Sequence, residues 1–200
     1  MVMKRNQKRT EQVIQQLITW KNERTGIFEN ASLPENLLPQ GVEKGSYEHI
    51  MFITMCSSID YQRNADEMWD AGRKTWNDEK TRWVFFPKLV KQKTLENLVL
   101  DLQKYKLSKK RDKDAGIWRT VSLSFLERFD GDPRNLFKKF EFDAIKIRDY
   151  MRKLGAGVFP YLAGSTSGGK INSMWIRILH DDAGISFRNY ENMPLPIDIH

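Results

Sequence analysis

Cysteine is almost absent from this 200-residue sequence, which has only Cys56, inside an apolar run. One cysteine cannot form a disulfide framework or supply the clustered thiolates of a multi-cysteine metal site. Its apolar neighbours indicate a small buried side chain rather than a nucleophile. Long apolar runs are also missing, and Met1 leads straight into polar sequence, so we predict neither a membrane span nor a signal peptide. These absences predict an intracellular, reducing compartment.

Strand patterns are missing too, because no stretch of useful length alternates apolar and polar residues. No internal repeat or low-complexity tract occurs either. Apolar residues instead recur at the three- and four-residue spacing of amphipathic helices, which predicts an all-α protein. Helices are expected at residues 11–23, 47–60, 65–72, 95–105, 114–129, 143–154 and 170–179, with a restart at Pro133 and a turn or helix end at 82–87.

Helix caps and breakers indicate the boundaries between these segments. Ser46, Thr94 and Asp132 are side chains that favour helix N-caps, and each precedes an expected helix. Residues 30–45 contain two prolines and two glycines and read as a loop. The segment 47–60 is apolar on nearly all sides, which is typical of a helix at the centre of a bundle.

Metal-ligating side chains are few, and His180, Asp181 and Asp182 form the one tempting group. Adjacent residues on a helix point in different directions, and no second cluster completes a coordination shell. We therefore expect no metal or other cofactor bound within this chain.

Acidic residues are outnumbered by basic ones, 26 against 33, which gives a formal net charge of +7. An excess of positive charge favours a polyanionic partner such as nucleic acid. The densest basic cluster is Lys104 to Arg111, between two expected helices. It reads either as a solvated connector or as a loop that flanks DNA.

The most informative stretch is the glycine-rich turn from Leu162 to Lys170, which opens directly onto a helical pattern. Backbone N–H groups at a helix start lack partners within the helix and carry the positive end of its dipole, so they bind anions well. A nucleotide-binding loop of the Walker type needs Ser or Thr after its lysine, whereas Ile171 follows here. A nucleic-acid backbone is the better candidate ligand.

The C-terminal segment is extended by Pro194 and Pro196, and Asp198 follows as a helix-capping type. Together with the glycine turn, this segment resembles the helix-hairpin-helix, endonuclease III-like DNA glycosylase superfamily. That family reads L-P-G-V-G-x-K at its hairpin and Val-Asp-x-His at its catalytic aspartate. The matching positions here are Leu162, Gly164, Gly168, Lys170 and Pro196-Ile197-Asp198-Ile199-His200. Ala163 replaces the hairpin proline, and Ser165-Thr166-Ser167 lengthens the hairpin.

The resemblance implies a fold of two helical lobes with DNA in the cleft between them. Residues 46–200 would form the glycosylase domain, mostly the six-helix barrel lobe. Residues 1–45 would belong to the second lobe, which is incomplete because the sequence stops just after the Asp198 motif. We therefore expect a C-terminally truncated chain, which as such could be inactive. Some relatives carry an iron–sulfur cluster in the sequence beyond this point, and the resemblance leaves that cluster open.

The resemblance also implies roles for individual residues. Lys170 would form a Schiff base with the sugar, and Asp198 would stabilise positive charge on it. The helix dipole at position 170 disfavours the ammonium form, which favours a nucleophilic amine. Gln62, or alternatively Asp60, would fill the gap left by an extruded base. The DNA backbone would contact Leu162, Gly164, Ser165, Gly168 and Gly169.

The predicted activity is therefore base-excision repair, in which a DNA glycosylase with AP-lyase activity removes a damaged or mismatched base after flipping it out of the duplex. Double-stranded DNA is the expected partner of a monomer in the cytoplasm, associated with the nucleoid, or in the nucleus. One alternative is a non-catalytic helix-hairpin-helix module that only binds DNA. Another is a helical protein–protein adaptor whose glycine-rich stretch is only a turn.

Overall fold

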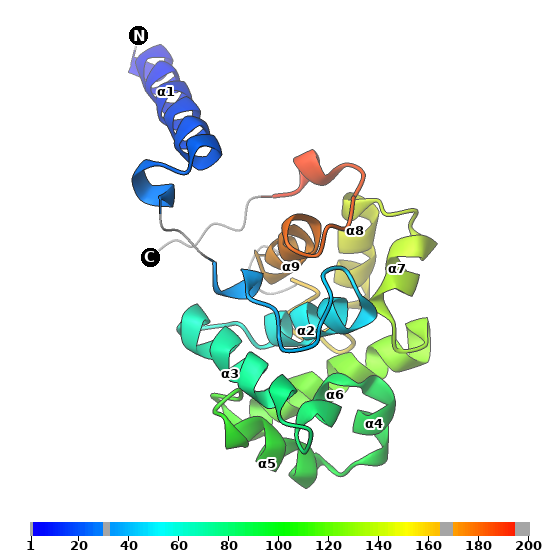
Figure 1. Cartoon of the computed structure of the whole chain (residues 1–200). Helices are drawn as coiled ribbons and strands as arrows, with labels where there is room; N and C mark the ends of the chain where they lie inside the picture. The colour runs from blue at the N-terminus through cyan, green and yellow to red at the C-terminus, as the bar shows by residue number, and fades with distance from the viewer. Residues whose placement is uncertain (1, 30–32, 165–169, 195–200) are drawn as a thin grey trace. The chain divides into compact units, whose positions relative to one another are not determined.

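The computed structural model describes residues 2–29, 33–164 and 170–194, with side chains from residue 7 onward (Figure 1). Within these ranges the chain is helical and contains no strand; Asp143 and Arg188 form an isolated bridge. The predicted all-α class is confirmed. The chain divides into two compact units, Met1–Leu33 and Pro34–His200.

The first unit contains the helix α1, Val2–Glu23, and a short 3₁₀ turn, Gly26–Phe28. The helix begins well before the predicted start at residue 11, because the preceding lysines, arginines and glutamine favour helix without adding an apolar stripe. Gly26 has φ +57°, and a Cβ added there would lie 2.8 Å from the Trp20 ring. The apolar side chains of Val13, Ile14 and Ile18 are exposed.

The second unit is a set of helices joined by turns and loops of different lengths (Figure 1). Its elements are η2 Pro34–Asn36, α2 Tyr47–Ser58, α3 Ala65–Asn77, η3 Arg82–Phe85, α4 Pro87–Gln92, α5 Leu95–Lys104, α6 Arg111–Phe129, α7 Pro133–Lys139, α8 Ala144–Leu154, α9 Lys170–Asp181 and η4 Tyr190–Asn192. The predicted caps are confirmed, since the side chains of Ser46, Thr94 and Asp132 each accept a backbone N–H in the following helix.

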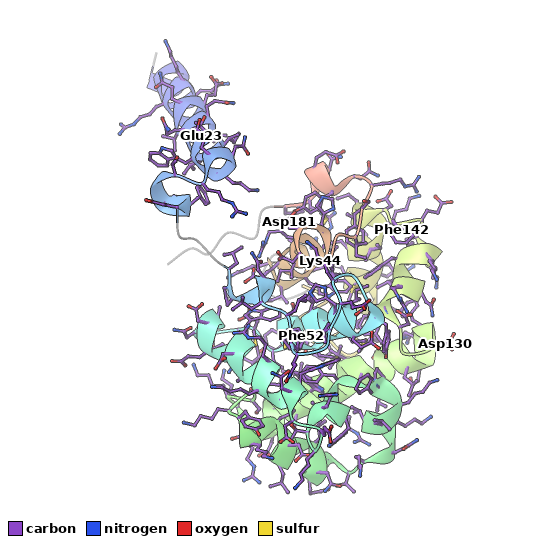
Figure 2. All side chains as sticks on the ribbon, in the orientation of Figure 1. Glu23, Lys44, Phe52, Asp130, Phe142 and Asp181 are labelled. Carbon is purple, nitrogen blue, oxygen red and sulfur yellow. The ribbon has the colours of Figure 1, made fainter. Side chains whose placement is uncertain are left out.

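Helix α2 lies at the centre of this unit and packs against α3, α6, α7 and α9. Every residue from His49 to Ser58 is buried, which confirms the prediction of a central helix. Phe52, labelled in Figure 2, makes edge contacts with Trp69 and Trp76 of α3. The apolar surface of α2 is therefore shared among several neighbours rather than turned toward one of them.

The segment 82–87, predicted as a turn or helix end, contains a turn, whereas one helix start differs from the sequence prediction. Residues 82–87 form the 3₁₀ turn η3 and the start of α4, whose first residue is Pro87. Helix α6 begins at Arg111 rather than at Asp114, so the end of the basic cluster lies on a helix. The apolar pattern could not reveal this first turn, because its residues are charged.

The contact between α2 and α3 depends on Gly72. A Cβ added at Gly72 would lie 2.9 Å from the Cys56 Sγ and 3.2 Å from the Phe52 ring. We expect Gly72→Ala to lower the free energy of unfolding by about 1–3 kcal/mol, although alanine favours helix, because these buried neighbours must move. Chemical denaturation measures this difference.

Gly116 offers a matched control on α6, because no atom lies within 4 Å of an added Cβ there. Gly116→Ala should raise the free energy of unfolding by about 0.5–1 kcal/mol through helix propensity alone. Equal effects at the two positions would contradict the packing argument for Gly72.

Candidate functional site

Lys170 is the first residue of α9, as the sequence predicts. Leu162, at the start of the glycine-rich stretch, is tied to the same helix, since the Asn172 Nδ2 donates to the Leu162 carbonyl at 2.7 Å. The Leu162 side chain is fully buried. Gly164 has φ +65° and is buried, which suits a glycine. Ser165, Gly168 and Gly169 lie outside the described residues, as does Asp198.

Helices α2 and α9 run antiparallel, and two contacts fix their register. The Trp175 Nε1 donates to the Thr54 Oγ1 at 3.0 Å in the middle of the pair. At one end, a Cβ added at Gly45 would lie 2.9 Å from the Ala183 carbonyl oxygen. Continuing this register toward the other end brings the start of α9, Lys170, beside the residues that follow α2, including Asp60.

Asp60 is a half-buried residue at this end of the helix pair. Burial raises the pKa of Asp60 to about 6, and the charge of Glu35 acts in the same direction. Arg63 and Lys170 oppose this shift through their positive charges, as does a hydrogen bond with Trp69. Lys170 is therefore close enough for its charge to act on a carboxyl that titrates near neutral pH.

Gln62 is an exposed residue of the loop between α2 and α3, and it has φ +51°. Its backbone carbonyl accepts from the Lys109 Nζ at 2.5 Å, and its Oε1 accepts from the Lys110 Nζ at 3.0 Å. Arg63 strengthens the link between the two loops by donating to the Leu107 carbonyl at 2.6 Å. Gln62 is thus held at the surface beside the basic cluster, whereas Asp60 points into more buried surroundings.

Asp114 joins these segments from the first turn of α6, where its carboxylate is almost fully buried. One oxygen accepts from the Tyr61 hydroxyl. The other accepts from the backbone N–H groups of Lys109 and Lys110, each at 2.7 Å. A single carboxylate therefore fixes the α2–α3 loop, the α5–α6 loop and the start of α6 relative to one another.

The rings of Tyr61 and Tyr161 stack with their centroids 4.2 Å apart and their planes 6° apart. The Lys113 Nζ lies 5.3 Å from the Tyr61 centroid and 5.4 Å from that of Tyr161. The Lys110 Nζ lies 5.0 Å from the Tyr61 centroid. Burial and the hydrogen bond to Asp114 raise the pKa of Tyr61, so its hydroxyl stays protonated.

We name this group, Tyr61, Tyr161, Lys109, Lys110 and Lys113, the tyrosine–lysine corner. Its three ammonium groups belong to exposed residues, and its rings are half-buried. Tyr161 lies just before the buried Leu162 of the glycine turn. The corner therefore places positive charge and aromatic surface next to the segment that leads to Lys170, a combination that suits a nucleic-acid strand.

Sequence reasoning missed several members of this site. Lys109 and Lys110 belong to the basic cluster that the sequence shows plainly. Tyr61, Tyr161, Lys113 and Asp114 carry no local pattern that predicts their meeting. An aspartate in the first turn of a helix, four residues after the Lys109-Lys110 pair, is the one available hint, and it is also typical of an ordinary helix start.

A second charged group lies along α9 toward its C-terminal end. The Arg177 Nη2 contacts the buried Glu35 Oε1 at 2.6 Å, and Asp181 lies one turn further on. Figure 2 labels Asp181 on α9 and Lys44 in the loop that precedes α2. The His180 ring stacks on Tyr190, with centroids 3.9 Å apart, and its Nδ1 contacts the Ile185 carbonyl. His180 is therefore occupied by structural contacts.

No group of His, Cys, Asp and Glu side chains suited to a metal ion occurs among residues 7–29, 33–164 and 170–194. In the same part of the chain, no helix is long and apolar enough to cross a membrane. Comparison with protein-family models, with curated proteins and with solved structures finds no match.

Proposed function

We propose that this chain carries the helix-hairpin-helix core of a DNA glycosylase with AP-lyase activity. The observation that carries the proposal is the placement of Lys170. It starts α9 directly after the glycine-rich turn, at the end of the α2–α9 pair where Asp60 lies. An amine at a helix start that follows a glycine-rich stretch is suited to nucleophilic attack on a bound sugar.

The proposed reaction begins when the neutral Lys170 amine attacks the C1′ of a flipped-out deoxyribonucleotide. The new C–N bond forms as the glycosidic bond breaks, and the base leaves with the bonding electron pair. Opening of the sugar ring then gives a protonated Schiff base, from which the strand can be cleaved. The resemblance assigns Asp198 to the stabilisation of positive charge on the sugar.

Duplex DNA is the proposed partner, bound through the glycine turn and the tyrosine–lysine corner. Phosphates would meet the lysines of the corner, and Gln62, held between Lys109 and Lys110, would reach the gap left by the base. A DNA substrate implies that the protein works in the cytoplasm at the nucleoid, or in a nucleus.

The corner makes a prediction about salt dependence. Replacing Lys109, Lys110 and Lys113 together by glutamine should weaken binding to an undamaged duplex. The slope of log affinity against log salt should also fall by about 2–3, because each lost phosphate contact removes roughly 0.9. Fluorescence anisotropy between about 50 and 200 mM salt measures both quantities.

A matched control replaces Lys138, Lys146 and Lys153, which are exposed on α7 and α8, by glutamine. This variant has the same net charge as the corner variant, so its salt slope should stay close to that of the unaltered protein. An equal loss in both variants would mean that net charge, and not the corner, governs binding.

Covalent trapping tests the proposed chemistry without requiring the lesion to be known. The full-length protein is incubated with a duplex that contains one abasic site, and borohydride reduces any Schiff base to a stable amine. Mass spectrometry should place the adduct on the peptide that contains Lys170. Salt-sensitive binding without an adduct would instead support a non-catalytic DNA-binding module. Absence of both would support the adaptor alternative.

A further inference from the structure

The backbone at Tyr161 adopts a strained three-residue turn. The Leu162 N–H donates to the Pro160 carbonyl at 2.7 Å across Tyr161, whose φ is +60°. A γ-turn with positive φ is rare, and an aromatic residue is seldom found in this region because its Cβ crowds the backbone. Strain of this kind persists where the surrounding structure holds a side chain in one required place. The place held here is the stack of the Tyr161 ring on Tyr61, with the two centroids 4.2 Å apart.

The outer face of Tyr161 is the side of the ring that points away from Tyr61. The Lys113 Nζ lies almost equally far from the two ring centroids, at 5.3 and 5.4 Å, so this ammonium lies beside the pair. Among the described residues, the ring contacts of Tyr161 are those with Tyr61 and Lys113. Its outer face therefore carries no aromatic or cationic contact in that part of the chain, and the residue is partly exposed.

The cations beside the stack are held in place by the neighbouring loop. The Lys110 Nζ lies 5.0 Å from the Tyr61 centroid and 3.0 Å from the Gln62 Oε1. The Lys109 Nζ donates to the Gln62 carbonyl at 2.5 Å. An aromatic surface with ordered positive charge beside it is the arrangement by which many proteins bind single-stranded nucleic acids. Bases stack on the ring, and phosphates contact the ammonium groups.

A stacking surface needs a base whose face is free. In an intact duplex each base is covered by its neighbours, so a protein ring can stack on a base only where pairing and stacking are interrupted. Lysines bind the phosphates of either form and do not need the tyrosines for that purpose. The Tyr61 hydroxyl is bonded to Asp114, so the corner offers the faces of its rings rather than this hydroxyl. These features favour an unpaired base as the ligand of the stack.

We infer that the outer face of Tyr161 stacks on an unpaired base of a single-stranded DNA segment, while the corner lysines contact the phosphates beside that base. This inference rests on the proposed function and deepens it, because it names DNA with an interrupted duplex as the preferred partner of the same surface. The strained turn at Tyr161 holds the ring where the stack continues into the DNA.

The test compares two DNA probes that have the same length and the same number of phosphates. One is a complete duplex, and the other carries a central bubble of unpaired thymines. The unaltered protein should bind the bubble about tenfold more tightly, which is within the range for stacking of one base on an aromatic ring. Fluorescence anisotropy measures both affinities. Because the phosphates are equal in number, the ratio of the two affinities should not fall as the salt concentration rises. Equal affinities would overturn the inference.

Three variants of Tyr161 separate the stacking contact from effects on folding. Tyr161→Ala should bring the ratio of the two affinities close to one, whereas Tyr161→Phe keeps the ring and should preserve the ratio. Tyr161→Gly should lose the preference as Tyr161→Ala does. It should nevertheless melt at a higher temperature than the alanine variant, because glycine accepts the positive φ at this position without strain. A bubble preference that survives in the alanine and glycine variants would overturn the inference.

Tyr150 on α8 provides the matched control, because it is another half-buried tyrosine with a lysine against its ring. The Lys139 Nζ lies 4.8 Å from the Tyr150 centroid. Tyr150→Ala removes a similar aromatic contact away from the corner and should keep the bubble preference. Loss of the preference in Tyr150→Ala to the same extent as in Tyr161→Ala would overturn the inference.

Binding to the two probes requires no chemistry, so failure of the inference can be told from failure of the proposed function. A bubble preference that depends on Tyr161 supports the inference whether or not an adduct forms on the abasic duplex. Absence of the adduct would then overturn the glycosylase proposal alone. An adduct on Lys170 without any bubble preference would overturn the inference and leave the proposed function standing.

Discussion

Lys170→Ala should lower the rate of covalent trapping on the abasic duplex by at least about a thousandfold. The imine that borohydride reduces requires an amine at the sugar, and alanine leaves none at the start of α9. Losing a nucleophile removes the covalent route itself, which is why the expected effect exceeds that of losing a proton acceptor. Gel analysis of the protein–DNA adduct over time measures the rate.

The fold should tolerate this change, because Lys170 lies at a helix end, is not fully buried and is replaced by a good helix former. Lys170→Arg is the matched variant, since it keeps the positive charge but cannot form a Schiff base. It should lose trapping while keeping the duplex affinity of the unaltered protein. One contrary result is trapping that survives in both variants with adducts on Lys109, Lys110 or Lys113. That result would contradict the assignment of Lys170 as the nucleophile.

The helix N-caps at Ser46, Thr94 and Asp132 were the part of the fold that sequence patterns predicted best. Ser46, Thr94 and Asp132 cap their helices as expected, because a cap is a hydrogen bond between residues two or three positions apart. The central position of α2 also followed from its composition alone. Interactions between residues within one helical turn can therefore be predicted from the local sequence.

Pairings between distant residues could not be predicted in the same way. Tyr61 and Tyr161 are a hundred positions apart, and their stacking depends on how α2, α6 and the turn before α9 pack together. Glu35 lies in a segment that reads as a loop, yet it is buried against Arg177. Tyrosine and glutamate occur in many different environments in proteins. The partners of these particular side chains are therefore determined by the tertiary packing and not by the local sequence.

Lys170 and Asp60 illustrate both situations. A glycine-rich turn before an apolar helical stripe predicts a lysine at the start of a helix, and the structure confirms this position. Asp60 was a candidate only for filling a gap in the DNA. Its position at the same end of the helix pair as Lys170 follows from the antiparallel register of α2 and α9, which contacts such as that between Trp175 and Thr54 determine.

Asp114→Ala should have the largest effect on stability among the site residues, lowering the free energy of unfolding by about 3–5 kcal/mol. The carboxylate is buried and accepts from the Tyr61 hydroxyl and from the backbone N–H groups of Lys109 and Lys110. Alanine would leave these donors in a buried site without an acceptor. A loss of this size corresponds to a fall in melting temperature of roughly 10 °C for a chain of this length.

Asp112 provides the control, because it is exposed in the same turn of α6. Asp112→Ala should change the free energy of unfolding by less than about 1 kcal/mol, mainly through the helix dipole. Since Asp114 also holds the backbone of two of the three corner lysines, Lys109 and Lys110, Asp114→Ala should weaken duplex binding even at a temperature where the variant is folded. A variant that is destabilised but binds DNA normally would show that the tyrosine–lysine corner does not form the interface. Loss of both stability and DNA affinity is expected if the Asp114 carboxylate supports the fold and the binding surface together.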